Sequence, residues 1–483
     1  MSRNRFDLVI RNGSVATSTD VFRADVGVTG GRIVALGLDL EAGREDIDAR
    51  GKLVLPGGID SHAHIEQLSA GGIMNADTFE SATRAAAFGG TTTVMSFAAQ
   101  HKGMSLRKVV DDYAALAARG AMVDYAFHMI LSDPTEQALA RDLPALIAEG
   151  HASIKLFMTY DKLKVEDETL LYVLAVAREH RALVCVHAEN HGMIAWMSHK
   201  LLSEGKTAPK HHAESHPRAS ETEAFTRLIA AAALVDQPIM IFHVSTAEGA
   251  ALVADARRQG QKVFAETCPQ YLFLTAADLD RPGLEGAKFM CSPPPREKAD
   301  QEALWAALAR GDLQTVSSDH APYRFDETGK LSGGPNPTFK QIANGLPGLE
   351  TRMPLMFDAM VSRKRPEFAG RALQAFVDLT ATAPARIYNL GGKGSIAVGL
   401  DADIAIWDPN RRVTLSDELM LGNTGYTPFA GRTVKGWPET VLVRGRIVAQ
   451  GGKVTGVAGS GRHIPRAGGW AAEPARRQRR APH

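Results

Sequence analysis

The amino-acid sequence predicts an α/β protein: a closed (β/α)8 barrel joined to a small β-sandwich domain that is formed from both chain ends. Eight apolar, strand-like runs lie between residues 54 and 318, and helix-like stretches rich in Ala, Leu and charge separate most of them. Continuous apolar strands with helical crossovers indicate a parallel sheet that is covered on both faces. Eight such units over about 250 residues favour a closed barrel over an open doubly wound sheet.

The strands of this TIM-like barrel can be placed in order. Two crossovers, 190–237 and 270–314, are long, and we expect extra helices in them. Gly89 and Gly90 precede a strand instead of opening a helix, so the phosphate-binding fingerprint of a dinucleotide-binding sheet is missing there. The predicted barrel strands are 54–65, 92–97, 125–131, 153–158, 183–188, 238–244, 262–267 and 315–318.

Both chain ends have a different pattern, with short strands broken by turn signals such as Asn12-Gly13. Such strands are expected at 6–11, 24–28, 32–36, 403–407 and 440–444. We therefore predict a discontinuous small β domain (1–55 plus 392–465), a barrel domain (56–391) and a basic tail (466–483) that we expect to be disordered.

Composition limits the possible partners. The 483 residues include 55 Lys and Arg against 54 Asp and Glu, which gives no strong field for nucleic acid or a membrane surface. The apolar runs are shorter than the roughly 20 residues of a membrane span. The first residues lack the apolar stretch of a secretion signal, so we expect a cytoplasmic protein. Cys185, Cys268 and Cys291 form no CxxC pair, and we expect buried, reduced thiols.

Residues that can bind a metal stand at the ends of five predicted strands. Two histidines two positions apart on a strand point the same way, so an HxH pair can reach one ion. The carboxyl ends of barrel strands converge on one face, where barrel active sites form. The predicted ligands are His62, His64, Lys155, His187, His243 and Asp319.

Each of these residues alone has a structural explanation. A strand-end histidine is often a satisfied polar residue, Lys155 can extend along apolar surface to reach solvent, and Asp319 can cap a helix. Six of them on five strands favour a metal site, for which Zn suits best, with Mn, Fe or Co possible. An ammonium is a poor ligand beside two dications. We therefore expect Lys155 to react with carbon dioxide to give a carbamate, an N6-carboxylysine, that bridges two metals.

A further histidine cluster lies at His211, His212 and His216. No predicted strand orients these side chains. We therefore interpret them as a polar connection between helices and not as a second metal site.

Several motifs together resemble the dihydropyrimidinase/hydantoinase (D-hydantoinase-like) family of the amidohydrolase superfamily, over about residues 6–465. They are PGGIDSHAH ending at His64, SIKLFMTY ending at Tyr160, VHAEN around His187, SSDH around Asp319 and NGLPG beginning at Asn344. The resemblance implies two divalent metal ions, with Zn as the expected metal, held by the six residues above. It also implies a homotetramer (or homodimer).

The resemblance further implies a hydrolase that opens cyclic amides, with a metal-bridging hydroxide attacking the ring. Tyr160 would stabilise the developing oxyanion, main-chain atoms of Ser292 and Asn344 would hold the ring amide, and Asp319 would move the proton. Without the resemblance, Tyr160 can be a packed rim aromatic and the other two can be turn residues. Dihydropyrimidines or 5-substituted hydantoins would give N-carbamoyl amino acids. The alternatives are an allantoinase, a cyclic imidase or, more distantly, a non-catalytic scaffold homologue.

Three segments are candidates for the wall around a ring substituent: 65–74, 159–164 and 88–97. Glu66 occupies the position where the related dihydroorotases carry an arginine for the substrate carboxylate. We expect Glu66 to face the substrate and to repel a carboxylate there.

Overall fold

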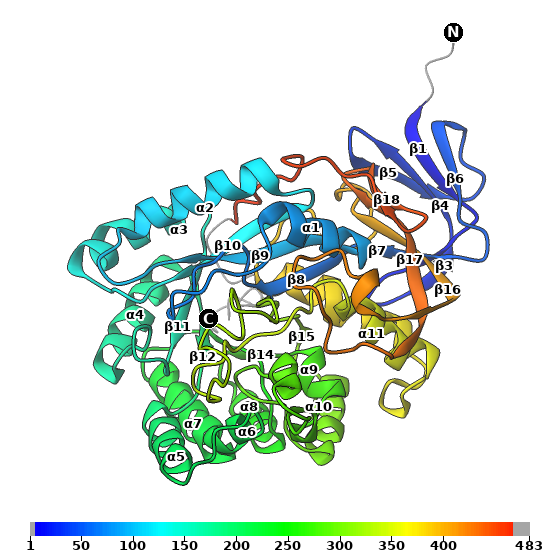
Figure 1. The fold of residues 1–483 in the computed structure, drawn as a ribbon. Coiled ribbons are helices and arrows are strands. Elements are labelled where there is room, and N and C mark those ends of the chain that lie inside the picture. Colours follow the sequence, from blue (N-terminus) through cyan, green and yellow to red (C-terminus); the bar gives the residue numbers. More distant parts are fainter. Residues whose placement is uncertain (1–4, 467–483) are drawn as a thin grey trace.

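The centre of the molecule is a parallel eight-stranded sheet that curls into a barrel (Figure 1). The structure is a computed structural model, and it describes residues 5–466. Each barrel strand pairs with its neighbours in the sequence, from β8 to β15, which confirms the predicted fold. The strands are β8 (Gly58–Ala63), β9 (Thr91–Ala99), β10 (Asp124–Ile130), β11 (Ser153–Phe157), β12 (Leu183–His187), β13 (Ile239–Ile241), β14 (Val263–Thr267) and β15 (Thr315–Val316).

Helices surround this barrel (Figure 1). The two long crossovers contain extra helices as predicted: α5, α6 and α7 between β12 and β13, and α9 and α10 between β14 and β15. No helix within residues 5–466 is long and apolar enough to cross a bilayer. The helices are α1 (Phe79–Phe88), α2 (Leu106–Gly120), α3 (Leu143–Ala148), α4 (Asp167–His180), α5 (His191–Ser203), α6 (His211–Ser215), α7 (Arg218–Leu234), α8 (Ala247–Arg258), α9 (Pro269–Phe273), α10 (Lys298–Arg310), α11 (Arg352–Phe357), α12 (Ala372–Val377) and α13 (Ala383–Ile387).

Strands from the N-terminal part of the chain (6–56) and from its C-terminal part (404–454) lie side by side and form two further sheets (Figure 1). One has the order β5-β4-β1-β6, and the other, β19-β18-β17-β16-β7-β2-β3, joins strands from both ends. The domain limits stay a prediction. The predicted tail 466–483 is wrong at its first residue, because the Arg466 side chain is buried and donates to Ser153 Oγ (2.8 Å), and the rest of the tail lies outside the described residues. The strands are β1 (Phe6–Arg11), β2 (Ser14–Ala16), β3 (Val21–Arg23), β4 (Asp25–Thr29), β5 (Arg32–Gly37), β6 (Gly43–Asp48), β7 (Leu53–Pro56), β16 (Ile404–Thr414), β17 (Thr433–Val443), β18 (Arg446–Gln450) and β19 (Lys453–Val454).

The predicted strand 54–65 is wrong in one respect, because the chain changes sheets inside it. The backbone N–H of Gly57 donates to the Asp403 carbonyl beside β16, whereas that of Gly58 donates to the Gly90 carbonyl beside β9 (both 2.9 Å). A side chain at Gly57 would collide with that of Thr92. The glycine therefore lets β7 end and β8 begin where the two sheets meet closely.

The barrel closes where its first strand meets its last. At this seam the Ser318 N–H donates to Asp60 Oδ1 (3.1 Å), and the His64 N–H donates to the His320 carbonyl (2.6 Å). The other carboxylate oxygen of Asp60 lies 3.2 Å from Arg352 Nε, and both side chains are fully buried. This ion pair therefore holds the seam from inside.

Replacing Arg352 by methionine should destabilise the protein strongly. Removing one partner of a buried ion pair leaves an uncompensated charge, which costs about 3–5 kcal/mol. The matched control is Arg107→Met, because Arg107 pairs with Glu149 at the surface, where such pairs contribute about 0–1 kcal/mol. Urea denaturation measures the free energy of unfolding of each variant. Equal losses in the two variants would contradict the role of the seam.

Candidate metal centre

The structure brings all nine residues predicted for the site to one cavity of about 310 Å³. They come from the ends of β8, β11, β12, β13 and β15 and from the loops that follow the strands. This is the convergence expected at the carboxyl face of a barrel. The nine residues are His62, His64, Lys155, Tyr160, His187, His243, Ser292, Asp319 and Asn344.

His62, His64 and Asp319 form the tightest group, with one ligand atom from each within 4.8 Å of the others. Asp319 Oδ1 lies 2.9 Å from His62 Nε2 and 3.5 Å from His64 Nε2. Burial alone would raise the pKa of Asp319, but the two imidazoles hold it well below its usual range. The group therefore offers an ionised carboxylate beside two ring nitrogens.

The other ring nitrogen of each histidine, Nδ1, already makes a hydrogen bond. His62 Nδ1 donates to Glu266 Oε1 (2.5 Å), and His64 Nδ1 donates to Gln67 Oε1 (2.7 Å). Each Nε2 therefore faces an oxygen of Asp319, and a cation is needed between the nitrogen and the oxygen, either a proton on the imidazole or a metal ion. The donor set therefore fits a metal ion. A carboxylate behind a ligating histidine is the usual way to fix its ring and tautomer.

Lys155 is 1% exposed and lies among aromatic rings. Its Nζ is 4.1 Å from the ring centre of Phe242 and 4.7 Å from that of Phe157. Burial lowers the pKa of this ammonium to about 7, so much of the amine is neutral near physiological pH.

His187 and His243 lie on the other side of the group, with ring centres 4.5 Å apart. Glu189 Oε2 accepts a hydrogen bond from His187 Nε2 (2.8 Å). Burial by itself would raise the pKa of Glu189, but His216 and His187 lower it to about 2, so it stays an anion. Glu189 therefore holds the His187 ring as Glu266 holds that of His62.

The backbone is strained at three of the nine residues. His243, Asp319 and Tyr160 have φ angles of 41°, 48° and 72°, in the left-handed region. Non-glycine residues adopt this region at a cost of about 1–3 kcal/mol each, and such residues cluster at functional sites. The strained backbone turns these side chains into the cavity.

Tyr160, Ser292 and Asn344 line the outer part of the cavity. Burial raises the pKa of Tyr160 well above its ordinary value, so its hydroxyl remains a proton donor at any working pH. The loops that carry Ser292 and Asn344 are joined, because the Met290 carbonyl accepts from the Gly345 N–H (3.0 Å) and from Lys330 Nζ (3.2 Å).

Two expectations about the walls are wrong. Segments 65–74 and 159–164 contribute to the cavity, but 88–97 does not, because Phe97 lies below it and stacks on His64 at 4.3 Å. Glu66 does not face the cavity. Its Oε2 accepts from the Phe79 N–H (3.1 Å) at the start of α1, so it cannot repel a substrate as expected.

The histidine cluster lies in the connection between α5 and α7, as predicted, but two of its members lie beside the cavity. His212 and His216 are buried, their ring centres are 4.4 Å apart, and the Nε2 atoms of both lie 3.4 Å from Ser292 Oγ. Their place beside the cavity depends on the path of the β12–β13 crossover, which the sequence pattern does not define.

Glu266 is the main site residue that the sequence analysis missed. It stands near the end of the seventh predicted strand, 262–267, and is fully buried. The rule that selected the histidines, a polar residue at the end of an apolar strand, applies to it equally.

The family model described as "Amidohydrolase family" matches residues 53–448, most of the chain. This chain belongs to the amidohydrolase family. It is 40% identical to a D-hydantoinase of Rhizobium radiobacter and 41% identical to one of Geobacillus stearothermophilus, over 94% and 95% of this chain and 98% and 96% of theirs. The dihydropyrimidinase of Brevibacillus agri superposes with a TM-score of 0.92 at 42% identity, over 96% of this chain and 99% of that one. The predicted dihydropyrimidinase/hydantoinase family is therefore confirmed.

Amidohydrolases of this family depend on a binuclear metal centre, and the His62–His64–Asp319 group is compatible with one of its two ions. His187 and His243 offer further nitrogen donors in the same cavity. Lys155 lines the same cavity.

Replacing Glu266 by glutamine should weaken metal binding about 10–100-fold, because the neutral amide no longer supports the His62 ring with a charge. Competition with a chromogenic chelator measures the affinity. Glu350→Gln is the control, since Glu350 is also buried but accepts from the backbone N–H groups of Leu421 and Gly422. Wild-type affinity in the Glu266 variant would contradict the role given to this carboxylate.

Proposed function

We propose that this chain is a metal-dependent hydrolase that opens cyclic amides: dihydropyrimidines or 5-substituted hydantoins, giving N-carbamoyl amino acids. The observation that carries the proposal is the meeting of four histidines, Lys155 and Asp319 at one buried cavity. The names of the relatives, D-hydantoinase and dihydropyrimidinase, support the substrate class.

In this proposal His62, His64, His187, His243 and Asp319 hold two divalent ions, with Zn as the native metal. When bound, the ions supply Lewis acidity and lower the pKa of a water from 15.7 toward about 7.

Lys155 is proposed as the bridging residue after carboxylation. Its neutral amine forms an N–C bond with carbon dioxide and releases one proton to solvent, which leaves a carbamate whose single negative charge is shared by two oxygens. The buried position supports this step, because burial lowers the pKa of Lys155 to about 7 and keeps the amine available. The product adds one negative charge to a site in which Asp319 is the nearest other anion.

The remaining residues act on the ring. The Tyr160 hydroxyl donates a hydrogen bond to the carbonyl oxygen as negative charge develops there, while main-chain atoms of Ser292 and Asn344 hold the ring amide. Asp319 accepts a proton from the attacking water and returns it to the leaving nitrogen. The ring C–N bond breaks, the carbonyl carbon gains the hydroxyl, and the nitrogen gains the proton.

An allantoinase or a cyclic imidase on the same scaffold is the second candidate, since each opens a ring by the same chemistry. Glu66 gives no repulsion against acidic rings, but it also supplies no cation for one. A homotetramer (or homodimer) in the cytoplasm stays a prediction from the family resemblance.

The test is hydrolysis of dihydrouracil, 5-phenylhydantoin, allantoin and succinimide by metal-loaded protein, beside Lys155→Ala, with metal counted per chain. We expect wild type to bind about two ions and open one of the first two rings, and Lys155→Ala to lose metal and activity. Lys330→Met is the control, because Lys330 is equally buried with a pKa of about 7 but donates only to the Met290 and Ala343 carbonyls, so metal should remain. If the wild-type protein opens no ring when Zn and bicarbonate are supplied, the proposal is refuted.

Replacing Tyr160 by phenylalanine should lower kcat about 10²–10³-fold, the usual effect of removing one oxyanion donor. Metal content should stay at the wild-type value, because Tyr160 is not a ligand in this proposal. Steady-state kinetics with the best ring, combined with metal analysis, separates the two effects. A variant with unchanged kcat would remove Tyr160 from the mechanism.

A further inference from the structure

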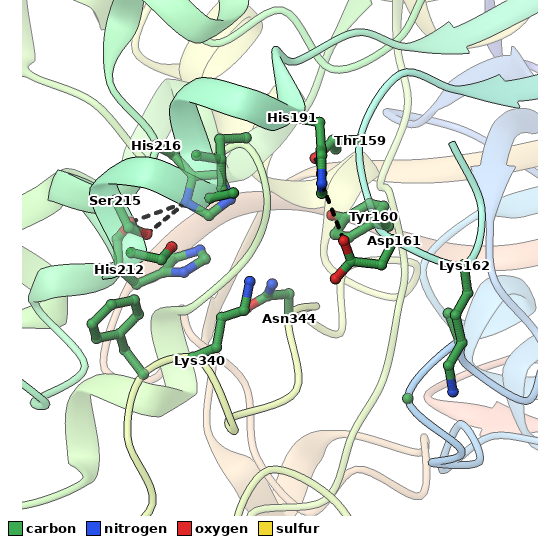
Figure 2. Close-up of a pocket in the computed structure, with 16 residues that line it drawn as sticks. Thr159, Tyr160, Asp161, Lys162, His191, His212, Ser215, His216, Lys340 and Asn344 are labelled. Atoms are coloured by element: carbon green, nitrogen blue, oxygen red, sulfur yellow. Dashed lines mark hydrogen bonds and ion pairs between the residues drawn. The ribbon is translucent and has the colours of Figure 1, made fainter. Parts of the chain in front are cut away.

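A second cavity, of about 320 Å³, opens beside the metal centre. Tyr160, Asn344 and Lys340 line both cavities, so a ring held between Tyr160 and Asn344 borders directly on the second one. Helices α5 and α6 and segments 159–162 and 339–340 form its other walls (Figure 2). The cavity therefore lies where a substituent of the ring can extend.

The positive charge of this cavity comes from lysine side chains. Figure 2 shows the Lys340 side chain directed at the space between His212 and Asn344. Within residues 5–466, neither Lys340 nor Lys162 has a carboxylate partner within 4.0 Å, and both residues are exposed. Lys162 lies apart from the other labelled side chains, at the far side of Asp161.

Asp161 is the single carboxylate among the residues that line the cavity. It lies 3.1 Å from His191 Nε2, on the wall opposite Lys340. Its charge is therefore shared with an imidazole and with solvent, since its side chain is 78% exposed.

His212 and His216 supply a polar wall. Burial lowers the pKa of both imidazoles, and the nearby Glu189 carboxylate opposes this effect at His216. His212 Nε2 donates to the Cys291 carbonyl (2.8 Å), and His216 Nδ1 lies 2.9 Å from Ser215 Oγ. The ammonium of Lys340 is thus the main unpaired charge that faces the space next to the ring.

We propose that this second cavity is the substituent subsite and that Lys340 selects rings whose substituent carries a carboxylate, such as 5-(carboxyalkyl)hydantoins. The inference rests on the proposed function and adds a substrate class to it. A carboxylate two or three bonds from the ring pairs with Lys340, while the uncharged walls accept its methylene groups. Asp161 opposes the same charge from the far wall.

The experiment compares kcat/KM for 5-(2-carboxyethyl)hydantoin with that for its neutral isostere, 5-(2-carbamoylethyl)hydantoin, using the metal-loaded full chain. We expect wild type to prefer the carboxylate. Lys340→Met should lower the ratio of the two kcat/KM values about five- to tenfold, the size of one charge pair near a protein surface. The effect of Lys340→Met on this ratio should be smaller in 0.5 M salt, because salt screens exposed charges.

Two further variants sharpen the test. Asp161→Asn should raise the same ratio, because it removes the opposing charge. Lys162→Met is the matched control: it removes an equal charge from the same cavity, but its ammonium is turned away, so the ratio should change less than with Lys340→Met.

The outcomes separate the inference from the proposed function. If the carboxamide ring opens and Lys340→Met leaves the ratio unchanged, the proposed function stands and the charge selection is refuted. Product inhibition gives a second way to refute the charge selection. If both N-carbamoyl products inhibit Lys340→Met less than wild type while the ratio of the two kcat/KM values is unchanged, Lys340 binds the product carboxylate and not the ring substituent. If neither ring opens, and dihydrouracil and 5-phenylhydantoin do not either, the proposed function fails first and the inference with it.

Discussion

Closure of the barrel is the constraint on which the rest of the site depends. His62 and His64 stand on the first barrel strand, and Asp319 follows the last, so only the seam between them brings these residues together. The Ser318 N–H donates to the Asp60 carboxylate and the His64 N–H donates to the His320 carbonyl, and these two hydrogen bonds fix the register of that seam. A shift by one residue would turn the histidines away from Asp319, because successive side chains on a strand point to opposite faces. The buried Asp60–Arg352 pair therefore stabilises the geometry of the site through the seam, without contacting the site itself.

The charges of the centre are arranged for cations. Four histidines and Lys155 meet in a space where Asp319 is the nearest anion, and two further carboxylates, Glu266 and Glu189, stand behind His62 and His187. Burying these groups without a counter-charge would be costly, since an unpaired buried charge is among the most destabilising features of a protein. A carbamate at Lys155 would replace a cation by an anion at the middle of the donor set. With the two proposed dications bound, the charges of the cluster would be nearly balanced.

Much of the fold and the ligand set could be predicted from the sequence, because both follow from short-range patterns. Apolar runs mark strands, and a polar residue at the end of such a run must lie on one face of a barrel; this placed His62, Lys155, His187 and Asp319 correctly in one cavity. The same reasoning failed where the chain path is not periodic. Gly57 breaks a run that looked continuous, Glu66 turns back to α1, and His212 reaches the site only because a long crossover folds over the barrel. Glu266 follows the same pattern of a polar residue at the end of an apolar strand, but its role, to accept a hydrogen bond from a ligand histidine, does not follow from that pattern.

The division between strands and loops also separates the chemistry from the choice of substrate. The proposed metal ligands stand at the ends of buried strands, where any shift disturbs the barrel itself. A chain that keeps this barrel therefore keeps their positions. The cavity beside them is lined by α5, α6 and the segments around Tyr160 and Lys340, which the barrel does not constrain in the same way. A change from Lys340 to an apolar residue would alter the charge of this cavity without moving a single strand. The motifs that reveal the reaction therefore carry little information about the ring substituent. That information lies in side chains such as Lys340, Asp161 and His216, whose positions depend on the crossovers.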